Sequence, residues 1–260
     1  MNHLRGHFGY HRAASVGTDL INEYAMRRRS GWPKNKVGNS TINRELALLR
    51  HAFHLGARHE PPLVARVPRI PEFVVPAPRK GFFEAAAFGR LRAELPEEVD
   101  QVATFAYWTG CRKSEILRLQ WSQVDLKERL VRLEITKSGE QRDIPLSGEL
   151  LGLLTRIRAE RDAGWPWCKH VFSRQGKPIR DYYASWRSAC RRAKLSGGAK
   201  LLHDLRRTGV RNLIRAGVPE KMAMLIWGHK TRPVFDRYHI VQTEEVREAM
   251  SKLEKYLGAK

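Results

Sequence analysis

The stretch Leu202-His203-Asp204-Leu205-Arg206-Arg207-Thr208 organises the interpretation of this 260-residue chain, together with Gly228-His229 and Tyr238 further on. In a helix that begins near His203, His203 and Arg206 are neighbours, because residues three positions apart share a helix face. A guanidinium binds two phosphate oxygens, an imidazole exchanges protons near neutral pH, and a phenol can act as a covalent nucleophile. These residue types suit chemistry on a phosphate, although any one of them alone would more often be a surface or core residue.

Two earlier segments complete an ordered set. They are Thr109-Gly110-Cys111-Arg112-Lys113-Ser114-Glu115-Ile116-Leu117 and Ile135-Thr136-Lys137-Ser138-Gly139. With these segments in this order, the chain resembles the tyrosine recombinases, also called phage integrases. The match covers roughly residues 80 to 245, with a weaker echo at Thr41–Arg50, and the ordered set is much more specific than any single motif.

Composition indicates a globular protein with a polyanionic partner. The hydrophobic fraction of 42% can supply a core, and the net charge of +21 with a pI near 10.4 favours nucleic acid. No run approaches the ~18 apolar residues of a membrane-spanning helix. The N-terminus lacks the apolar core of a signal peptide, so we expect a cytoplasmic, nucleoid-associated protein without a membrane partner. Cys111, Cys168 and Cys190 are too widely spaced for a disulfide framework or a zinc site, so we expect reduced, packed thiols.

The resemblance implies a mainly α fold with a small β-sheet (α+β), arranged as a two-domain, C-shaped clamp on DNA. Residues 1–60 read as a helical core-binding (SAM-like) domain, with helices at Thr18–Arg29 and from Ser40 or Thr41 to His59. The family usually carries one more helix ahead of these, so we expect an N-terminally shortened domain. Six prolines between Glu60 and Arg79 predict a linker over residues 61–79. Residues 80–260 then form the catalytic domain, with a C-terminal interaction helix.

Local signals predict the elements of this second domain. A helix over Glu97–Trp108 stops at Gly110, and Arg112 opens the next helix. Alternating polar and apolar residues at Arg129–Glu134 and Gln141–Pro145 predict a β-hairpin with a turn at residues 137–140. Further helices are expected over Asp204–Ala216, Pro219–Gly228 and Thr243–Leu257. The last of these has an apolar stripe formed by Val246, Met250, Leu253 and Leu257, which would pack on its own domain or, as in the resembling family, on a neighbouring protomer.

Candidate DNA contacts lie in two basic regions. Residues 174–215 hold twelve Lys plus Arg and two acidic residues, the most lopsided window of the chain. From it we select Arg187, Arg191 and Arg207, and from the first domain Arg44 and Arg50, as phosphate contacts. The alternative is a merely solvated basic face, the usual fate of scattered charge. Tyr182, Tyr183 and Trp186 fall at helical spacing and are assigned to the core.

The resemblance also implies a role for each candidate catalytic residue. Tyr238 would attack the phosphate and form a 3′-phosphotyrosine bond, while Arg112 and Arg206 hold the non-bridging oxygens. Lys137 would protonate the leaving 5′-oxygen, His203 would act as acid and base near the tyrosine, and His229 would hydrogen-bond the phosphate. Taken singly, Arg112 could instead form a surface pair with Glu115, and Lys137 could be an ordinary turn lysine.

The expected activity is therefore site-specific recombination of double-stranded DNA by a homo-oligomer, dimer to tetramer, without metal, ATP or other cofactor. Two alternatives share the chemistry or the fold: a DNA-binding protein with impaired catalysis, and a type IB topoisomerase-like enzyme. A metal-dependent nuclease would need a carboxylate cluster that the sequence lacks. Trp227, Lys230 and His239 depart from the family pattern, but none of them removes a catalytic group.

Overall fold

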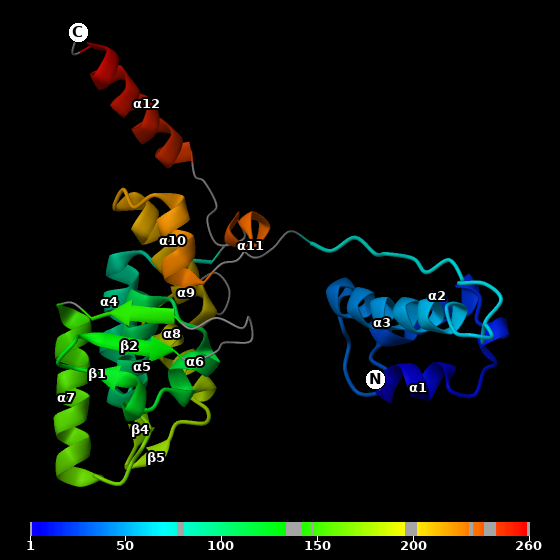
Figure 1. The fold of residues 1–260 in the computed structure, drawn as a ribbon, viewed down its shortest axis with the longest axis horizontal. Coiled ribbons are helices and arrows are strands. Elements are labelled where there is room, and N and C mark those ends of the chain that lie inside the picture. Colours follow the sequence, from blue (N-terminus) through cyan, green and yellow to red (C-terminus); the bar gives the residue numbers. More distant parts are fainter. Residues whose placement is uncertain are drawn as a thin grey trace. The chain divides into compact units, whose positions relative to one another are not determined.

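The computed structural model describes residues 2–76, 81–133, 142–146, 148–195, 202–228, 231–236 and 243–258. The chain divides into two compact units, Met1–Pro78 and Arg79–Lys260. The first unit is helical, and the second combines helices with short strands (Figure 1). The predicted mainly α fold with a small β-sheet is confirmed.

The first unit is built on two long helices, α2 (Thr18–Ser30) and α3 (Asn39–Ala57). They are preceded by α1 (Asn2–Phe8) and the short 3-10 helix η1 (Ala13–Ser15). α3 buries one face through Ile42, Leu46, Leu49 and Phe53, which recur at helical spacing. α2 ends at Gly31, whose φ of 117° is a conformation that glycine adopts without strain. The two predicted helices of this region are therefore present.

Much of the proline-rich segment packs on the first unit. Ile70 is buried in the same core as α2 and α3. The backbone of Phe73 exchanges two hydrogen bonds with the side-chain amide of Asn43, at 2.7 and 3.0 Å. Arg50 donates from Nη2 to the carbonyl of Ile70 at 3.1 Å. Prolines leave this extended backbone without its own helical or sheet hydrogen bonds, so side chains of α3 supply partners.

The second unit contains the remaining elements. Its helices are α4 (Ala85–Glu94), α5 (Glu97–Thr109), α6 (Lys113–Arg118), α7 (Glu149–Gly164), α8 (Tyr183–Arg192), α9 (Leu202–Arg215), α10 (Glu220–Trp227), α11 (Arg232–Asp236) and α12 (Thr243–Gly258), with the 3-10 helix η2 (Trp121–Gln123). Its strands are β1 (Val124–Asp125), β2 (Leu130–Leu133), β3 (Arg142–Pro145), β4 (Ser173–Arg174) and β5 (Lys177–Pro178). The strands β1, β2 and β3 form an antiparallel sheet in that order.

The predicted hairpin is present as β2 and β3, with Val131 opposite Ile144. Its turn, which includes Lys137, lies outside the described residues. α5 is buried on nearly all sides and forms the centre of the main core, and Figure 1 shows α7 beside the sheet. Trp186 and Tyr182 belong to this core, as expected, whereas Tyr183 is exposed.

The three cysteines are buried, as expected of packed thiols. Across the described ranges, no helix has the length and apolarity needed to cross a bilayer. The C-terminal helix α12 matches the predicted helix closely. Its four stripe residues, Val246, Met250, Leu253 and Leu257, are 47% to 60% exposed, so the stripe is not buried in the described part of its own unit.

Candidate active site

Arg206 joins the ends of two helices. It lies one turn into α9 and is only 2% exposed. Its Nη1 donates to the carbonyl of Gly110 and its Nη2 to the carbonyl of Trp227, both at 2.6 Å. Gly110 caps α5, and Trp227 is the last residue of α10. Carbonyls at helix C-termini lack intrahelical donors and carry partial negative charge, so a buried guanidinium is well matched to them.

Arg112 is the N-cap of α6 and follows Gly110 by two residues. The hydrogen bond from Arg206 to the Gly110 carbonyl therefore anchors the chain just before Arg112. The pair with Glu115, which the sequence left open as the alternative role of Arg112, is present: Glu115 Oε2 accepts from the Arg112 backbone N–H and Oε1 from Arg112 Nη1, each at 2.7 Å. The Arg112 side chain is nevertheless 40% exposed. It is therefore held from one side by Glu115 and remains open to a ligand on the other.

Arg142, at the start of β3, also binds Glu115. Its Nη2 lies 3.3 Å from Glu115 Oε2 and 3.2 Å from the Cys111 sulfur. Burial opposes ionisation of Glu115, but the hydrogen bonds from Arg112 and the charges of Arg142 and Arg112 outweigh it and lower the pKa of this carboxyl. Burial raises the pKa of the Cys111 thiol, so it stays protonated.

Sequence reasoning missed Arg142. A signal was available in the hairpin pattern: Arg142 shares the face of β3 that carries the buried Ile144. A charged side chain on the inward face of a strand needs a partner of opposite charge. Nothing local in the sequence names that partner, because Glu115 lies 27 residues away.

His203 lies in the first turn of α9, one turn from Arg206, as predicted. The residue is exposed, but the protein packed around the ring removes solvent and lowers its pKa. The positive charges of Arg206 and Arg207 lower this pKa further, and the carboxylate of Asp204 opposes them. His203 is therefore neutral at pH 7 and can accept a proton.

The sequence model of the phage integrase family matches residues 92–245, which is more than half of the chain. The chain belongs to the phage integrase family. The family segment contains α9 with His203 and Arg206, α6 with Glu115, and the β2–β3 hairpin. Membership agrees with the resemblance drawn from the ordered motifs.

Two curated members of the family are similar in sequence. The shufflon-specific DNA recombinase of Escherichia coli is 27% identical over 225 residues, covering 81% of this chain and 52% of that protein. The integrase of Salmonella phage P22 is 25% identical over 206 residues, covering 73% of this chain and 52% of that protein. The chain thus spans about half the length of these curated relatives.

Solved structures share the fold. The Tn1549 transposon integrase in complex with transposon right end DNA matches with a TM-score of 0.74 and 18% identity, covering 93% of this chain and 86% of that one. XerH recombinase bound to a palindromic difH substrate matches with a TM-score of 0.72 and 15% identity, covering 97% and 77%. Identities this low establish the fold alone.

Three of the six predicted catalytic residues are described: Arg112 at the N-cap of α6, and His203 and Arg206 in α9. The other three, Lys137, His229 and Tyr238, lie outside the described residues. The chain leading to one of them is described up to Gly228, which caps α10 with a φ of 62°. A Cβ at Gly228 would lie 3.4 Å from Arg142 Nη1, so the end of α10 is next to Arg142.

The five predicted DNA contacts occupy different settings. Arg44, Arg187 and Arg191 are exposed, and the guanidinium of Arg187 lies 5.6 Å from the centre of the Tyr183 ring. Arg207 is half-buried beside Arg206. Arg50 is half-buried too, and its hydrogen bond to the Ile70 carbonyl gives it a structural task. The exposed three are the freest to meet a phosphate.

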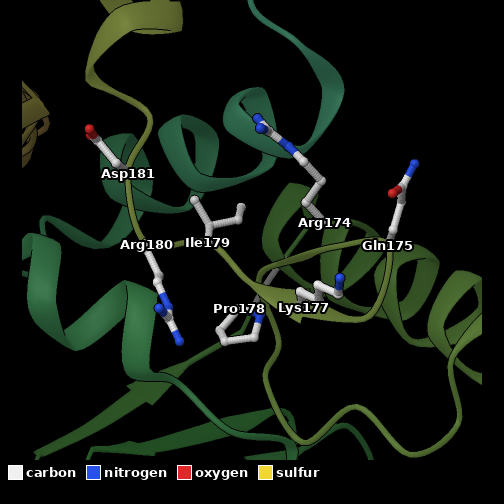
Figure 2. Close-up of a pocket in the computed structure, with 7 residues that line it drawn as sticks. All are labelled: Arg174, Gln175, Lys177, Pro178, Ile179, Arg180 and Asp181. Atoms are coloured by element: carbon white, nitrogen blue, oxygen red, sulfur yellow. The ribbon is translucent and has the colours of Figure 1, made fainter.

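A shallow pocket lies over the β4–β5 hairpin. Its lining residues are Arg174, Gln175, Lys177, Pro178, Ile179, Arg180 and Asp181. Figure 2 shows Arg180 pointing away from Arg174 and Lys177, so the basic groups do not converge on one point. Arg174 also pairs with Glu98. The pocket contains none of the three described catalytic candidates.

Proposed function

We propose that this chain is a site-specific DNA recombinase that cuts and rejoins DNA through a 3′-phosphotyrosine bond, without metal or ATP. The observation that carries the proposal is the placement of Arg206 against Gly110, two residues before Arg112. This contact joins Arg206 to the chain segment that carries Arg112, although the two segments are almost a hundred residues apart in sequence. Family membership supports the same activity, as do curated relatives described as a DNA recombinase and an integrase.

The proposed cleavage step exchanges one phosphoester bond for another. The phenol oxygen of Tyr238 attacks phosphorus, the bond from phosphorus to the 5′-oxygen breaks, and His203 accepts the phenol proton. Lys137 gives a proton to the departing 5′-oxygen, which leaves as a hydroxyl. Arg112 and Arg206 stabilise the charge on the non-bridging oxygens, and His229 donates a hydrogen bond to one of them. A second 5′-hydroxyl reverses these steps and reseals the strand.

Charge supports double-stranded DNA as the substrate. The net charge of +21 and the exposed Arg44, Arg187 and Arg191 suit a phosphate backbone. The solved Tn1549 integrase and XerH structures contain DNA. In the proposal this chain binds DNA in the same way, with its two units closing on the duplex as a clamp and with Arg50 and Arg207 as further phosphate contacts.

The exposed stripe of α12 supports assembly on DNA. Val246, Met250, Leu253 and Leu257 form one continuous apolar face. In this proposal the stripe docks on a second copy of the chain, which gives a dimer or tetramer on the recombining sites. A topoisomerase-like enzyme that acts alone would have no use for such a face.

The test is covalent capture on nicked duplex DNA carrying a candidate recombination site, in the presence of chelator. The wild type is expected to form a DNA adduct stable to denaturant, and Tyr238→Phe is expected to form none. An adduct that survives in the variant overturns the nucleophile, and one that chelator abolishes overturns metal independence.

Two further outcomes identify the alternatives. Salt-sensitive DNA binding without an adduct in the wild type would favour a DNA-binding protein with impaired catalysis. Efficient relaxation of a supercoiled plasmid that lacks the site would favour the topoisomerase-like activity.

A further inference from the structure

Arg142 contacts three parts of the candidate active site from a strand that carries none of the predicted catalytic residues. Its side chain is 9% exposed. It reaches Glu115 on α6, Cys111 in the α5–α6 connection, and the space beside Gly228 at the end of α10. Each of these residues is next to, or one turn from, a predicted catalytic position.

We propose that Arg142 is a positioning residue for DNA cleavage, which acts on the phosphate through Glu115 and Arg112. This inference rests on the proposed function. It assigns Arg142 no contact with the substrate.

Arg142 fixes the orientation of the Glu115 carboxylate. The two oxygens of Glu115 are divided between two arginines: Oε1 accepts from Arg112 Nη1, while Oε2 accepts from the Arg112 backbone and from Arg142 Nη2. With Oε2 held on both sides, the carboxylate cannot rotate freely, and Oε1 presents a fixed acceptor to Arg112. The orientation of the Arg112 guanidinium is thereby fixed from strand β3.

Arg142 also sets the net charge around Arg112. A carboxylate paired with Arg112 alone would cancel the charge that a phosphate needs. With Arg142 included, the group of two arginines and one glutamate keeps a net charge of +1. Glu115 is only 11% exposed, so water screens this interaction weakly and the second guanidinium has a large effect.

Arg142 also lies close to the end of α10. The atom Arg142 Nη1 lies 3.4 Å from the position that a Cβ on Gly228 would occupy. Gly228 has a positive φ and directly precedes His229. Arg142 therefore lies beside the last described residue of α10, which directly precedes the predicted catalytic residue His229.

The experiment compares Arg142→Met, Arg142→Lys and the control Arg132→Met in single-turnover cleavage of nicked DNA, with DNA affinity and thermal unfolding measured on the same proteins. Arg132 is a matched control because it lies on the adjacent strand β2, is 48% exposed, and forms a long ion pair of 3.7 Å with Asp125. Loss of positioning is expected to slow cleavage by Arg142→Met about 100-fold, with DNA affinity changed less than threefold. Arg142→Lys should recover part of the rate, and Arg132→Met should stay within about twofold of the wild type.

A double variant separates positioning from general stability. If Arg142 acts by holding and neutralising Glu115, then Glu115→Gln in the Arg142→Met background should cause no further loss and should restore part of the rate. Losses that simply add, or a parallel fall in rate, affinity and melting temperature in both Arg142 variants, would overturn the inference and leave Arg142 a structural residue. Cleavage by Arg142→Met at the wild-type rate would overturn it too. If the wild type itself forms no adduct, the proposed function fails and the inference fails with it, whereas the preceding outcomes leave the proposed function intact.

Discussion

Single residues around Arg206 show how closely the active-site helices approach. The indole of Trp227 is 1% exposed and lies against Gly110 and Gly209. A Cβ added at Gly110 would lie 0.9 Å from the ring, and one at Gly209 would lie 2.2 Å from it. Trp227 also supplies a carbonyl to Arg206. The two glycines therefore leave the room that this large side chain needs, and the position of Arg206 depends on them.

Gly209→Ala is expected to destabilise the second unit by about 1–3 kcal/mol, because the new methyl group overlaps the Trp227 ring in a packed core. The matched control is Gly152→Ala in α7, where a Cβ meets nothing within 4 Å. That exposed helical site should gain about 0.5–1 kcal/mol, since alanine is the better helix former. Chemical unfolding of both variants measures the difference, and equal shifts in the two would contradict the account.

A buried polar network joins the helices α2 and α3. Arg28 binds both oxygens of Glu45, at 2.9 and 2.7 Å, and the Tyr24 hydroxyl donates to Oε2 at 2.8 Å. Arg28 is 4% exposed. Burial opposes ionisation of Glu45, but hydrogen bonds from Arg28 and Tyr24 outweigh it, so the pKa of this carboxyl is lowered.

Glu45→Gln should destabilise the first unit by about 3 kcal/mol, because it leaves the Arg28 charge buried without its counter-charge. The control Glu23→Gln breaks an exposed pair with Arg27 at 3.8 Å and should cost less than about 1 kcal/mol. The lowered pKa also sets a pH dependence: Glu45 contributes stability above its ordinary value near 4.5, and this is lost as pH falls through the lower folded-state pKa. Denaturant unfolding between pH 3 and pH 7 tests both statements, and a Glu45→Gln variant with an unchanged pH profile would contradict the second.

The elements that were predictable from sequence are those with local causes. The helix expected over Glu97–Trp108 is observed as Glu97–Thr109, because its apolar spacing and its stop at Gly110 are both written within one segment. The proline-rich segment could be recognised as irregular, but its packing near Ile70 depends on α3. The same limit applies within the candidate site, where ordered motifs predicted Arg112 and Arg206 as catalytic residues. The pair between Arg112 and Glu115 is local in sequence. The contacts of Arg206 with Gly110 and Trp227 join distant segments and depend on the tertiary structure.

The net charge of the whole molecule favours DNA binding but opposes association between copies of the chain. A net charge of +21 favours DNA of any sequence, since phosphate contacts carry no sequence information. Charge alone also repels a second copy of the same chain. In the proposed assembly, DNA would neutralise the charge, and the exposed stripe of α12 would supply the apolar contact between copies.

Leu253→Glu on α12 should leave the single protomer folded and bound to one DNA site, because Leu253 is 47% exposed and a charge there costs little in the monomer. In a protein–protein contact the same charge would be buried without a partner, so complexes with two or more copies on DNA should be lost. Ser251→Glu is the control, since it adds one charge to the same helix on an exposed position off the stripe. Native gel shifts and mass measurements of the DNA complexes compare the two. Loss of assembly in both variants would point to charge alone, and retention in both would place the contact between copies elsewhere on the molecule.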